Sequence, residues 1–263
     1  MGILNATPDS FFDGGKYSSK DQGLSRVSQM LTEGADWIDI GAASSRPHSA
    51  VIELEEEWSR LNALVPHIRK EFPEVPLSVD TWRAEIARRA WEEGIDLVND
   101  ISAGSLDSKM WDFIEAKKVP YCLMHMQGSP QNMQDMPSYD NVVADQLKWF
   151  SSRLAELRSR GLSDILIDPG FGFGKDLKHN YQMLKGLEAY HHLGCPILVG
   201  LSRKSMINKL LNITAVEALN GTTVLHTLAL QKGAAILRVH DVKEAKQTIE
   251  ISQYFNSVPD ALI

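Results

Sequence analysis

Short apolar runs alternate with longer segments of helical periodicity along the chain. Eight runs rich in Val, Ile or Leu are typical of buried strands: 1–5, 37–41, 75–80, 96–100, 119–126, 164–168, 196–202 and 234–241. Between the runs, apolar residues recur every three or four positions, most clearly in 24–34, 55–72, 82–94, 140–161 and 215–233. This spacing predicts amphipathic helices. Glycines that suit helix C-caps follow many of them: Gly34, Gly94, Gly161, Gly194 and Gly233.

Eight strands that alternate with helices predict an α/β fold, and specifically a (β/α)8 TIM barrel. An open doubly wound sheet is disfavoured because it usually has fewer strands. The chain has 263 residues and contains no low-complexity stretch or linker. We therefore expect one domain over residues 1–263, with no second domain fused to it.

Polar residues close every apolar run. They are Asn5, Asp39, Asp80, Asn99 with Asp100, His125, Asp168, Ser202 to Lys204, and Arg238 with His240. In a (β/α)8 barrel the carboxyl ends of the strands carry the chemistry. The pattern therefore predicts a shared site at this end of the barrel, although single acids could instead cap the helices that follow them.

The kinds of side chain at these ends indicate what could bind. Asp80, Asn99 and Asp168 offer acceptors and an amide, and Lys204 adds a donor. Such a set would recognise a flat heterocycle with alternating ring N–H and C=O groups. Arg238, in the buried run 234–241, indicates an anion, because a buried cation is costly without a negative partner.

Several common sites are excluded by spacing. The segment DPGFGFGK, residues 168–175, has Pro169 where a nucleotide phosphate loop needs glycine, and Asp176 where it needs Ser or Thr. Its Phe171 and Phe173 could present aromatic surface to a substrate or simply cover the barrel rim. The sequence has no G-x-S-x-G nucleophile elbow and no H-E-x-x-H zinc motif.

Composition narrows the class of protein. The net charge is −7, with no basic block, which disfavours a nucleic-acid partner. No apolar run approaches the ~18 residues of a membrane helix, and the N-terminus has no targeting pattern, so we expect a cytoplasmic protein that does not enter a membrane. Cys122 and Cys195 lie in apolar runs, and we predict that both are buried and reduced.

Eight motifs, in order from Met1 to about Val242, resemble those of the dihydropteroate synthase family. They are MGILNATPDSFFDGG, SSRP, SVDT, VNDIS, MHMQGSPQNMQ, DPGFGFGK, LVGLSRKSMI and RVHDV. The resemblance implies a pterin-binding (β/α)8 barrel, usually a homodimer and a target of sulfonamides. Members of the family are transferases that join p-aminobenzoate to 6-hydroxymethyl-7,8-dihydropterin diphosphate. They use Mg2+ and release pyrophosphate, by a dissociative route through a pterin cation.

The resemblance also implies roles for individual residues. The pterin would be bound by Asp80, Asn99, Asp168 and Lys204. The diphosphate would be bound by Asn5, which also serves Mg2+, and by Arg46, Arg238 and His240. The p-aminobenzoate would be bound by Ser45, Pro47, Phe173 and Ser205. The catalytic residues would be Asp80, Lys204 and Arg238.

One loop departs from the family pattern, and two alternatives stay open. The segment GAASSRP has Ala43 where the family often has Glu, and Ser45 where it has Thr. A pterin-binding barrel that has lost turnover through this loop is one alternative. A methyltransferase that uses methyltetrahydrofolate and a corrinoid partner is the other, but it would leave the SRKS and RVHDV segments without a role.

Overall fold

Eight parallel strands form the centre of the computed structural model, which describes residues 1–6, 19–43, 52–129, 133 and 137–259. The strands are β1 (Gly2–Asn5), β2 (Ile38–Gly41), β3 (Leu77–Asp80), β4 (Leu97–Asp100), β5 (Tyr121–Met124), β6 (Ile165–Asp168), β7 (Leu198–Val199) and β8 (Ile236–Leu237). Each lies inside one of the eight runs that the hydrophobic pattern predicted. The ladders of β7 and β8 are only two residues long.

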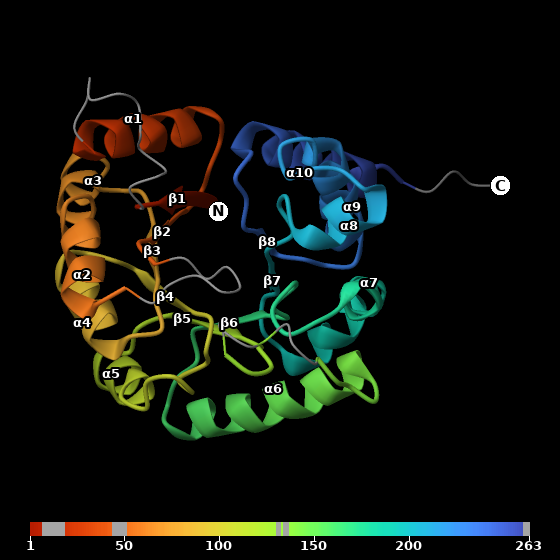
Figure 1. Ribbon diagram of the computed structural model, residues 1–263, viewed down its shortest axis with the longest axis horizontal. Coiled ribbons are helices and arrows are strands. Elements are labelled where there is room, and N and C mark those ends of the chain that lie inside the picture. Colours follow the sequence, from red (N-terminus) through yellow and green to blue (C-terminus); the bar gives the residue numbers. More distant parts are fainter. Residues whose placement is uncertain (7–18, 44–51, 130–132, 134–136, 260–263) are drawn as a thin grey trace.

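The strands close into a ring, as Figure 1 shows. Strands β1 to β6 pair in sequence order, and β7 pairs with β8. Parallel bridges join the two groups at both edges, between Ile167 and Ile197 and between Gly2 and Val239. At the second edge, the Val239 N–H donates to the Met1 carbonyl at 2.9 Å. The predicted (β/α)8 barrel is therefore confirmed.

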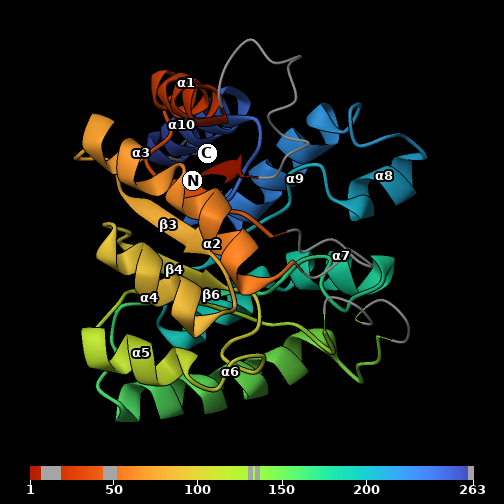
Figure 2. The same ribbon diagram turned by 60° about the vertical axis from the view of Figure 1, so that its left-hand side comes forward.

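Helices form an outer layer around the strands (Figures 1 and 2). They are α1 (Ser19–Thr32), α2 (Leu54–Asn62), α3 (Val65–Glu71), α4 (Ala84–Glu92), α5 (Met110–Lys117), α6 (Val142–Ser159), α7 (Leu177–Lys185), the 3-10 helix η2 (Leu187–Leu193), α8 (Ser205–Leu211), α9 (Leu219–Gln231) and α10 (Val242–Ser257). All five glycines predicted to end helices have positive φ, between 66° and 96°. Left-handed backbone of this kind favours glycine because it has no Cβ.

One predicted helix is divided in two. The pattern over 55–72 predicted a single helix, but α2 ends at Asn62 and α3 starts at Val65, with Pro66 in its first turn. Proline suits the start of a helix because the N–H that it lacks would have no partner inside the helix there.

The barrel wall is buried on both faces. All four residues of β2, β4 and β5 are buried, which is typical of parallel strands covered by helices. Cys122 and Cys195 are buried and free, as predicted. A polar side chain inside such a wall needs a partner within the protein, because water does not reach it.

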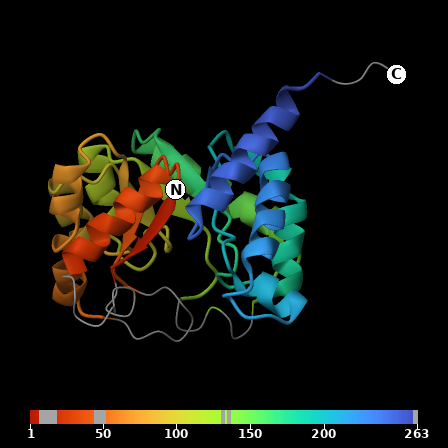
Figure 3. The same ribbon diagram turned by 90° about the horizontal axis from the view of Figure 1, so that it is seen from above.

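Helices α9 and α10 pack against each other and carry apolar side chains into solvent. Figure 3 shows α10 extending beyond its neighbours. The exposed apolar residues of these two helices, which we name the α9–α10 face, are Val224, Leu228, Ile251, Tyr254 and Phe255.

Candidate active site

Arg238 connects two strands at the barrel mouth, the end where the strands have their carboxyl termini. Its Nε donates to Asp39 Oδ2 at 2.6 Å and its Nη2 donates to Asp80 Oδ2 at 2.7 Å. Asp39 is fully buried, and the Asp80 side chain is 16 % exposed. The buried cation therefore has negative partners within the protein, and an arriving anion would compete with them for its N–H groups.

Asp39 accepts hydrogen bonds from three side chains of the mouth, which its position in the sequence did not indicate. Besides Arg238, it accepts a hydrogen bond from Asn99 Nδ2 at 3.2 Å and another from the Ser78 hydroxyl. Strand register places Asp39 opposite Ser78 and Gly41 opposite Asp80, so Asp39 lies one layer below Asp80. Sequence reasoning noted Asp39 among the polar strand residues but gave it no role. The signal was an acid inside the apolar run WIDIG.

The pKa values of Asp80 and Arg238 are both raised, but for different reasons. Loss of hydration raises the pKa of Asp80 to about 7, against the opposing charge of Arg238. Burial disfavours charge on Arg238 as well, but the carboxylates of Asp39 and Asp80 outweigh it and raise the Arg238 pKa. Asp80 is thus a carboxyl group that can change its charge near neutral pH beside a permanent cation.

Lys204 and Asp168 form the other half of the mouth. Lys204 Nζ donates to the Phe171 carbonyl and lies 4.4 Å from the centre of the Phe173 ring. Burial lowers the pKa of Lys204 to about 8, and Asp168 is the largest opposing influence. Burial also raises the pKa of Asp168, and there Lys204 opposes it.

These groups act on one another across the mouth. The charges of Arg238 and Asp80 also influence the pKa of Lys204, so both halves share one electrostatic environment. We name the following set the mouth cluster: Asp39, Asp80, Asn99, Asp168, Lys204 and Arg238. The structure thus brings together the residues predicted to bind a flat heterocycle and adds Asp39 beneath them.

The conformation of the loop after β6 explains why Gly170 of DPGFGFGK is a glycine. Gly170 has a φ of 70°, and a Cβ there would lie 2.1 Å from the His125 carbonyl oxygen. The Gly170 N–H donates to Asp168 Oδ1 at 2.7 Å, so this acid also holds its own turn. Phe171 is buried in the core, whereas Phe173 is partly exposed. The expectation of aromatic surface therefore applies to Phe173.

Other predicted residues lie at strand ends or outside the described part of the chain. Asn5 is exposed at the end of β1, and Ser205 is exposed at the start of α8. His240 is exposed, and its Nδ1 lies 3.0 Å from the Ser202 hydroxyl. The predictions for Ser45, Arg46 and Pro47 fall outside the described residues.

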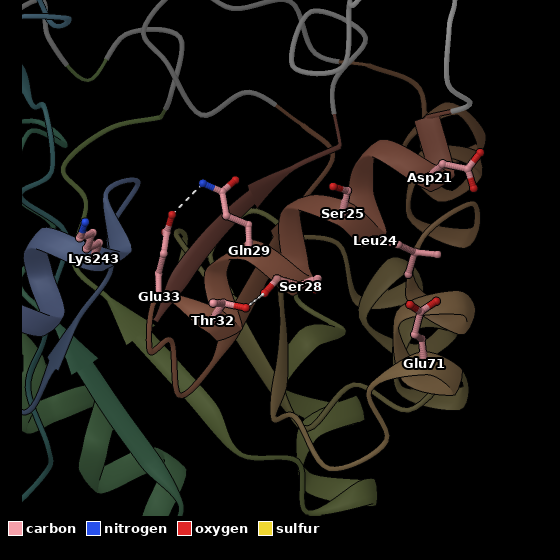
Figure 4. A pocket seen from close by; sticks show the side chains of 9 residues that line it. All are labelled: Asp21, Leu24, Ser25, Ser28, Gln29, Thr32, Glu33, Glu71 and Lys243. Carbon is pink, nitrogen blue, oxygen red and sulfur yellow. Dashed lines mark hydrogen bonds between the residues drawn. The ribbon is translucent and has the colours of Figure 1, made fainter.

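A separate groove lies on the outer helical layer, along α1 (Figure 4). It is lined by Asp21, Leu24, Ser25, Ser28, Gln29, Thr32, Glu33, Glu71 and Lys243. None of these residues belongs to the mouth cluster or was predicted to bind a ligand. The groove is therefore a feature of the barrel exterior.

Comparison with known proteins matches this architecture to one family. The family model for pterin binding enzyme matches residues 1–240. The dihydropteroate synthase of Escherichia coli (strain K12) is 43% identical over 253 residues, covering 95% of this chain and 89% of the relative. The chain belongs to the dihydropteroate synthase family. It is therefore a transferase by family, and the match to dihydropteroate synthases over 95% of the chain favours the synthase over the methyltransferase alternative.

Solved structures agree with this family over almost the whole chain. A Yersinia pestis dihydropteroate synthase in a sulfonamide drug complex superposes with a TM-score of 0.91 at 41% identity, covering 98% of this chain and 94% of that one. A Xanthomonas albilineans dihydropteroate synthase with 4-aminobenzoic acid gives 0.91 at 37% identity, with 98% and 93% coverage. The Xanthomonas enzyme in complex with 7,8-dihydropteroate gives 0.88 at 35% identity, with the same coverage.

Two features are absent from the described residues. They contain no group of three or more His, Cys, Asp or Glu side chains able to hold a metal ion. No helix among them is long and apolar enough to cross a membrane.

Proposed function

We propose that the chain catalyses the dihydropteroate synthase reaction at the mouth cluster. In this reaction the amine of p-aminobenzoate displaces the diphosphate of 6-hydroxymethyl-7,8-dihydropterin diphosphate, giving 7,8-dihydropteroate and pyrophosphate. The observation that carries the assignment to this site is the contact of Arg238 with both Asp39 and Asp80, beside Asn99 at the same strand ends. It combines an anion-binding cation and heterocycle-binding groups in one place.

Pterin binding is assigned to the acids and the amide of the cluster. Asp80 and Asp168 supply acceptors for ring N–H and amino groups, and Asn99 both donates and accepts. Lys204 interacts with the charge of Asp168 and lies 4.4 Å from the centre of the Phe173 ring, so it is assigned to both the pterin and p-aminobenzoate. Phe173 and Ser205, together with Ser45 and Pro47 of the second loop, are the proposed p-aminobenzoate residues.

The diphosphate is assigned to Arg238, together with His240, Asn5 and Arg46. Arg238 already makes two charge-assisted hydrogen bonds, each of a kind worth roughly 1.5–3 kcal/mol. When a diphosphate arrives, its oxygens can replace the Asp80 carboxylate on Nη2 while Asp39 keeps Nε in place. Asp39 would then act as the fixed anchor of the guanidinium.

A Mg2+ ion is expected to arrive with the diphosphate. The exposed side-chain oxygen of Asn5 is a hard ligand of the kind that Mg2+ accepts. A single protein oxygen is sufficient, because Mg2+ at such sites takes most of its ligands from phosphate and water. The ion would neutralise charge on the leaving group.

The chemistry needs no strong general base. The C–O bond at the exocyclic methylene breaks, and its electron pair leaves with the diphosphate. The dihydropterin ring delocalises the positive charge that remains, and the ionised Asp80 carboxylate stabilises it electrostatically. The nitrogen of p-aminobenzoate then forms the new C–N bond and loses its proton to solvent.

Three further properties belong to the proposal. We infer a homodimer, supported by the five exposed apolar side chains of the α9–α10 face, because large apolar side chains in solvent are buried when such a face meets a partner. We also infer a cytoplasmic location and one domain over residues 1–263.

The direct test is to measure pyrophosphate release and dihydropteroate formation together. The purified protein is given the dihydropterin diphosphate, with and without Mg2+ and p-aminobenzoate. We expect dihydropteroate only when all three are present. Release of pyrophosphate without formation of dihydropteroate would indicate that the p-aminobenzoate binding site is defective. Ala43→Glu would then be the first variant to examine. Pterin binding without any turnover would favour the inactive-barrel alternative.

A further inference from the structure

Lys175 is a buried cation behind the loop that carries Asp168 and Phe173. It is 2 % exposed. Its Nζ lies within hydrogen-bond distance of three backbone carbonyl oxygens, those of His125 at 2.9 Å, Gly170 at 2.9 Å and Phe173 at 2.8 Å. These contacts join the segment after β5 to both ends of the turn after β6.

The three carbonyls favour the ammonium form of Lys175. An ammonium group has three N–H donors, whereas a neutral amine has two and would leave one of the three carbonyl oxygens without a donor. Burial lowers the pKa of Lys175 well below its ordinary value, and the Asp168 carboxylate opposes this effect. We therefore assign the charged form, with all three donors used by carbonyls.

The neighbouring His125 fits the same assignment. Its Nδ1 lies 3.1 Å from Lys175 Nζ and 3.3 Å from Gln146 Nε2. With the three Lys175 donors assigned to carbonyls, Nδ1 is left to accept from Gln146, and we assign the ring proton to Nε2. Burial and then the charge of Lys175 lower the pKa of His125 to about 3, so the imidazole stays neutral.

Two of the carbonyls belong to residues that determine the site geometry. Gly170 donates its N–H to Asp168 Oδ1 at 2.7 Å while its own carbonyl accepts from Lys175. Gly170 is thus held on both sides, and Asp168 is held through it. The Phe173 carbonyl is bound by Lys175, while the Phe173 ring lies 4.4 Å from Lys204 Nζ.

We propose that Lys175 is a positioning residue for both substrates: through the carbonyls of Gly170 and Phe173 it fixes Asp168 for the pterin and Phe173 for p-aminobenzoate. It acts from behind the loop and touches neither substrate. The inference rests on the proposed function, since it assigns the two ends of one loop to the two substrates of that reaction.

The test compares Lys175→Met with the matched control Lys178→Met. Lys178 is exposed on α7, three positions further on, so its change removes the same charge without any of these contacts. For both variants and the wild type, three quantities are measured: the melting temperature, the Kd for 6-hydroxymethylpterin as a function of pH, and the steady-state constants.

For Lys175→Met we expect the pterin Kd and the KM for p-aminobenzoate each to rise about tenfold, because Asp168 and Phe173 are then held less well in their binding positions. The value of kcat should fall less than either constant rises. Removing a positive charge near Asp168 also raises the pKa of this carboxyl group. As the pH is lowered, the variant should therefore lose pterin affinity at a higher pH than the wild type does. Lys178→Met should match the wild type in every quantity.

A folded Lys175→Met variant with wild-type Kd, KM and pH dependence would overturn the inference. If this variant does not fold, Lys175→Gln, which keeps two donors without the charge, is measured in the same way. Failure of both to fold would also overturn it, because Lys175 would then serve stability alone. A wild-type protein that makes no dihydropteroate would reject the proposed function instead, so the two failures are distinguishable.

Discussion

Arginine–carboxylate pairs occur both at the barrel mouth and on the outside of α4, and they behave in opposite ways. On α4, Arg88 and Arg89 donate to Glu85 at 2.7 to 2.9 Å, and hydrogen bonds from these two arginines lower the pKa of Glu85 to about 2. At the mouth, Arg238 donates to Asp80 at 2.7 Å, yet burial raises the pKa of Asp80 to about 7.

Water explains the difference. The Glu85 side chain is 39 % exposed and keeps most of its hydration, so its hydrogen bonds determine the shift. Asp80 is 16 % exposed, and the loss of hydration outweighs one arginine contact. The Glu85 carboxylate therefore stays ionised near neutral pH. The mouth pairs can exchange partners with a charged ligand, which is what an anion-releasing reaction needs.

The largest expected effect follows from removing the cation of the mouth. In Arg238→Met, Asp39 and Asp80 lose their shared partner, and the diphosphate loses its main binding group. We expect kcat/KM to fall roughly a hundred- to a thousandfold, the usual loss when one group that stabilises the charge developing on a leaving group is removed. Steady-state kinetics of dihydropteroate formation measures this, and a fall of less than tenfold would remove Arg238 from the mechanism.

A smaller loss is expected when only the anchor of Arg238 changes. Asp39→Asn keeps the size of the side chain but removes the charge that accepts from Arg238 Nε and Asn99 Nδ2. We expect kcat/KM to fall about ten- to a hundredfold, the worth of one charge-assisted contact. Asp36→Asn, on the exposed turn before β2, serves as the control. Equal activity of the two variants would show that Asp39 has only a packing role.

The pH dependence should report the two shifted groups of the mouth. Asp80 stabilises the cation only when ionised, so activity should rise as pH increases through about 7. Lys204 acts as a cation, so activity should fall as pH increases through about 8. The kcat/KM profile of the free enzyme should therefore be a narrow bell. Lys204→Arg should remove the basic limb, and a basic limb that persists in this variant would assign it to another group.

The smallest effect is expected on the exterior. Glu85→Gln removes the charge that Arg88 and Arg89 share, but these groups remain hydrated. Exposed ion pairs of this kind contribute little, so we expect a shift in Tm of less than about 2 °C and unchanged kinetics. Thermal unfolding with an activity assay checks both. Loss of activity in Glu85→Gln would contradict the claim that only the ion pairs at the barrel mouth take part in the reaction.

Periodicity and residue type carried much of the fold prediction, because strand and helix periods are local properties. The eight runs and the glycine caps were visible in the sequence in this way. The break between α2 and α3 was also visible, at Pro66, but the apolar spacing continued through it.

The partners within the mouth could not be predicted in the same way. Arg238 meets Asp39 from 199 positions away and Asp80 from 158 positions away, so barrel closure decides the contact. In the sequence, Lys175 is only the last residue of DPGFGFGK, a segment that does not match the phosphate-loop pattern. Its three carbonyl partners are backbone atoms, which residue types do not reveal.

The central claim, that the mouth cluster is the active site, is tested most directly by a crystal structure with Mg2+ and the dihydropterin diphosphate, without p-aminobenzoate. The account predicts the pterin ring hydrogen-bonded to Asp80, Asn99 and Asp168. It also predicts the diphosphate on Arg238, with Nε still held by Asp39. A pterin bound elsewhere, for example in the groove along α1, or a diphosphate that makes no contact with Arg238, would contradict it.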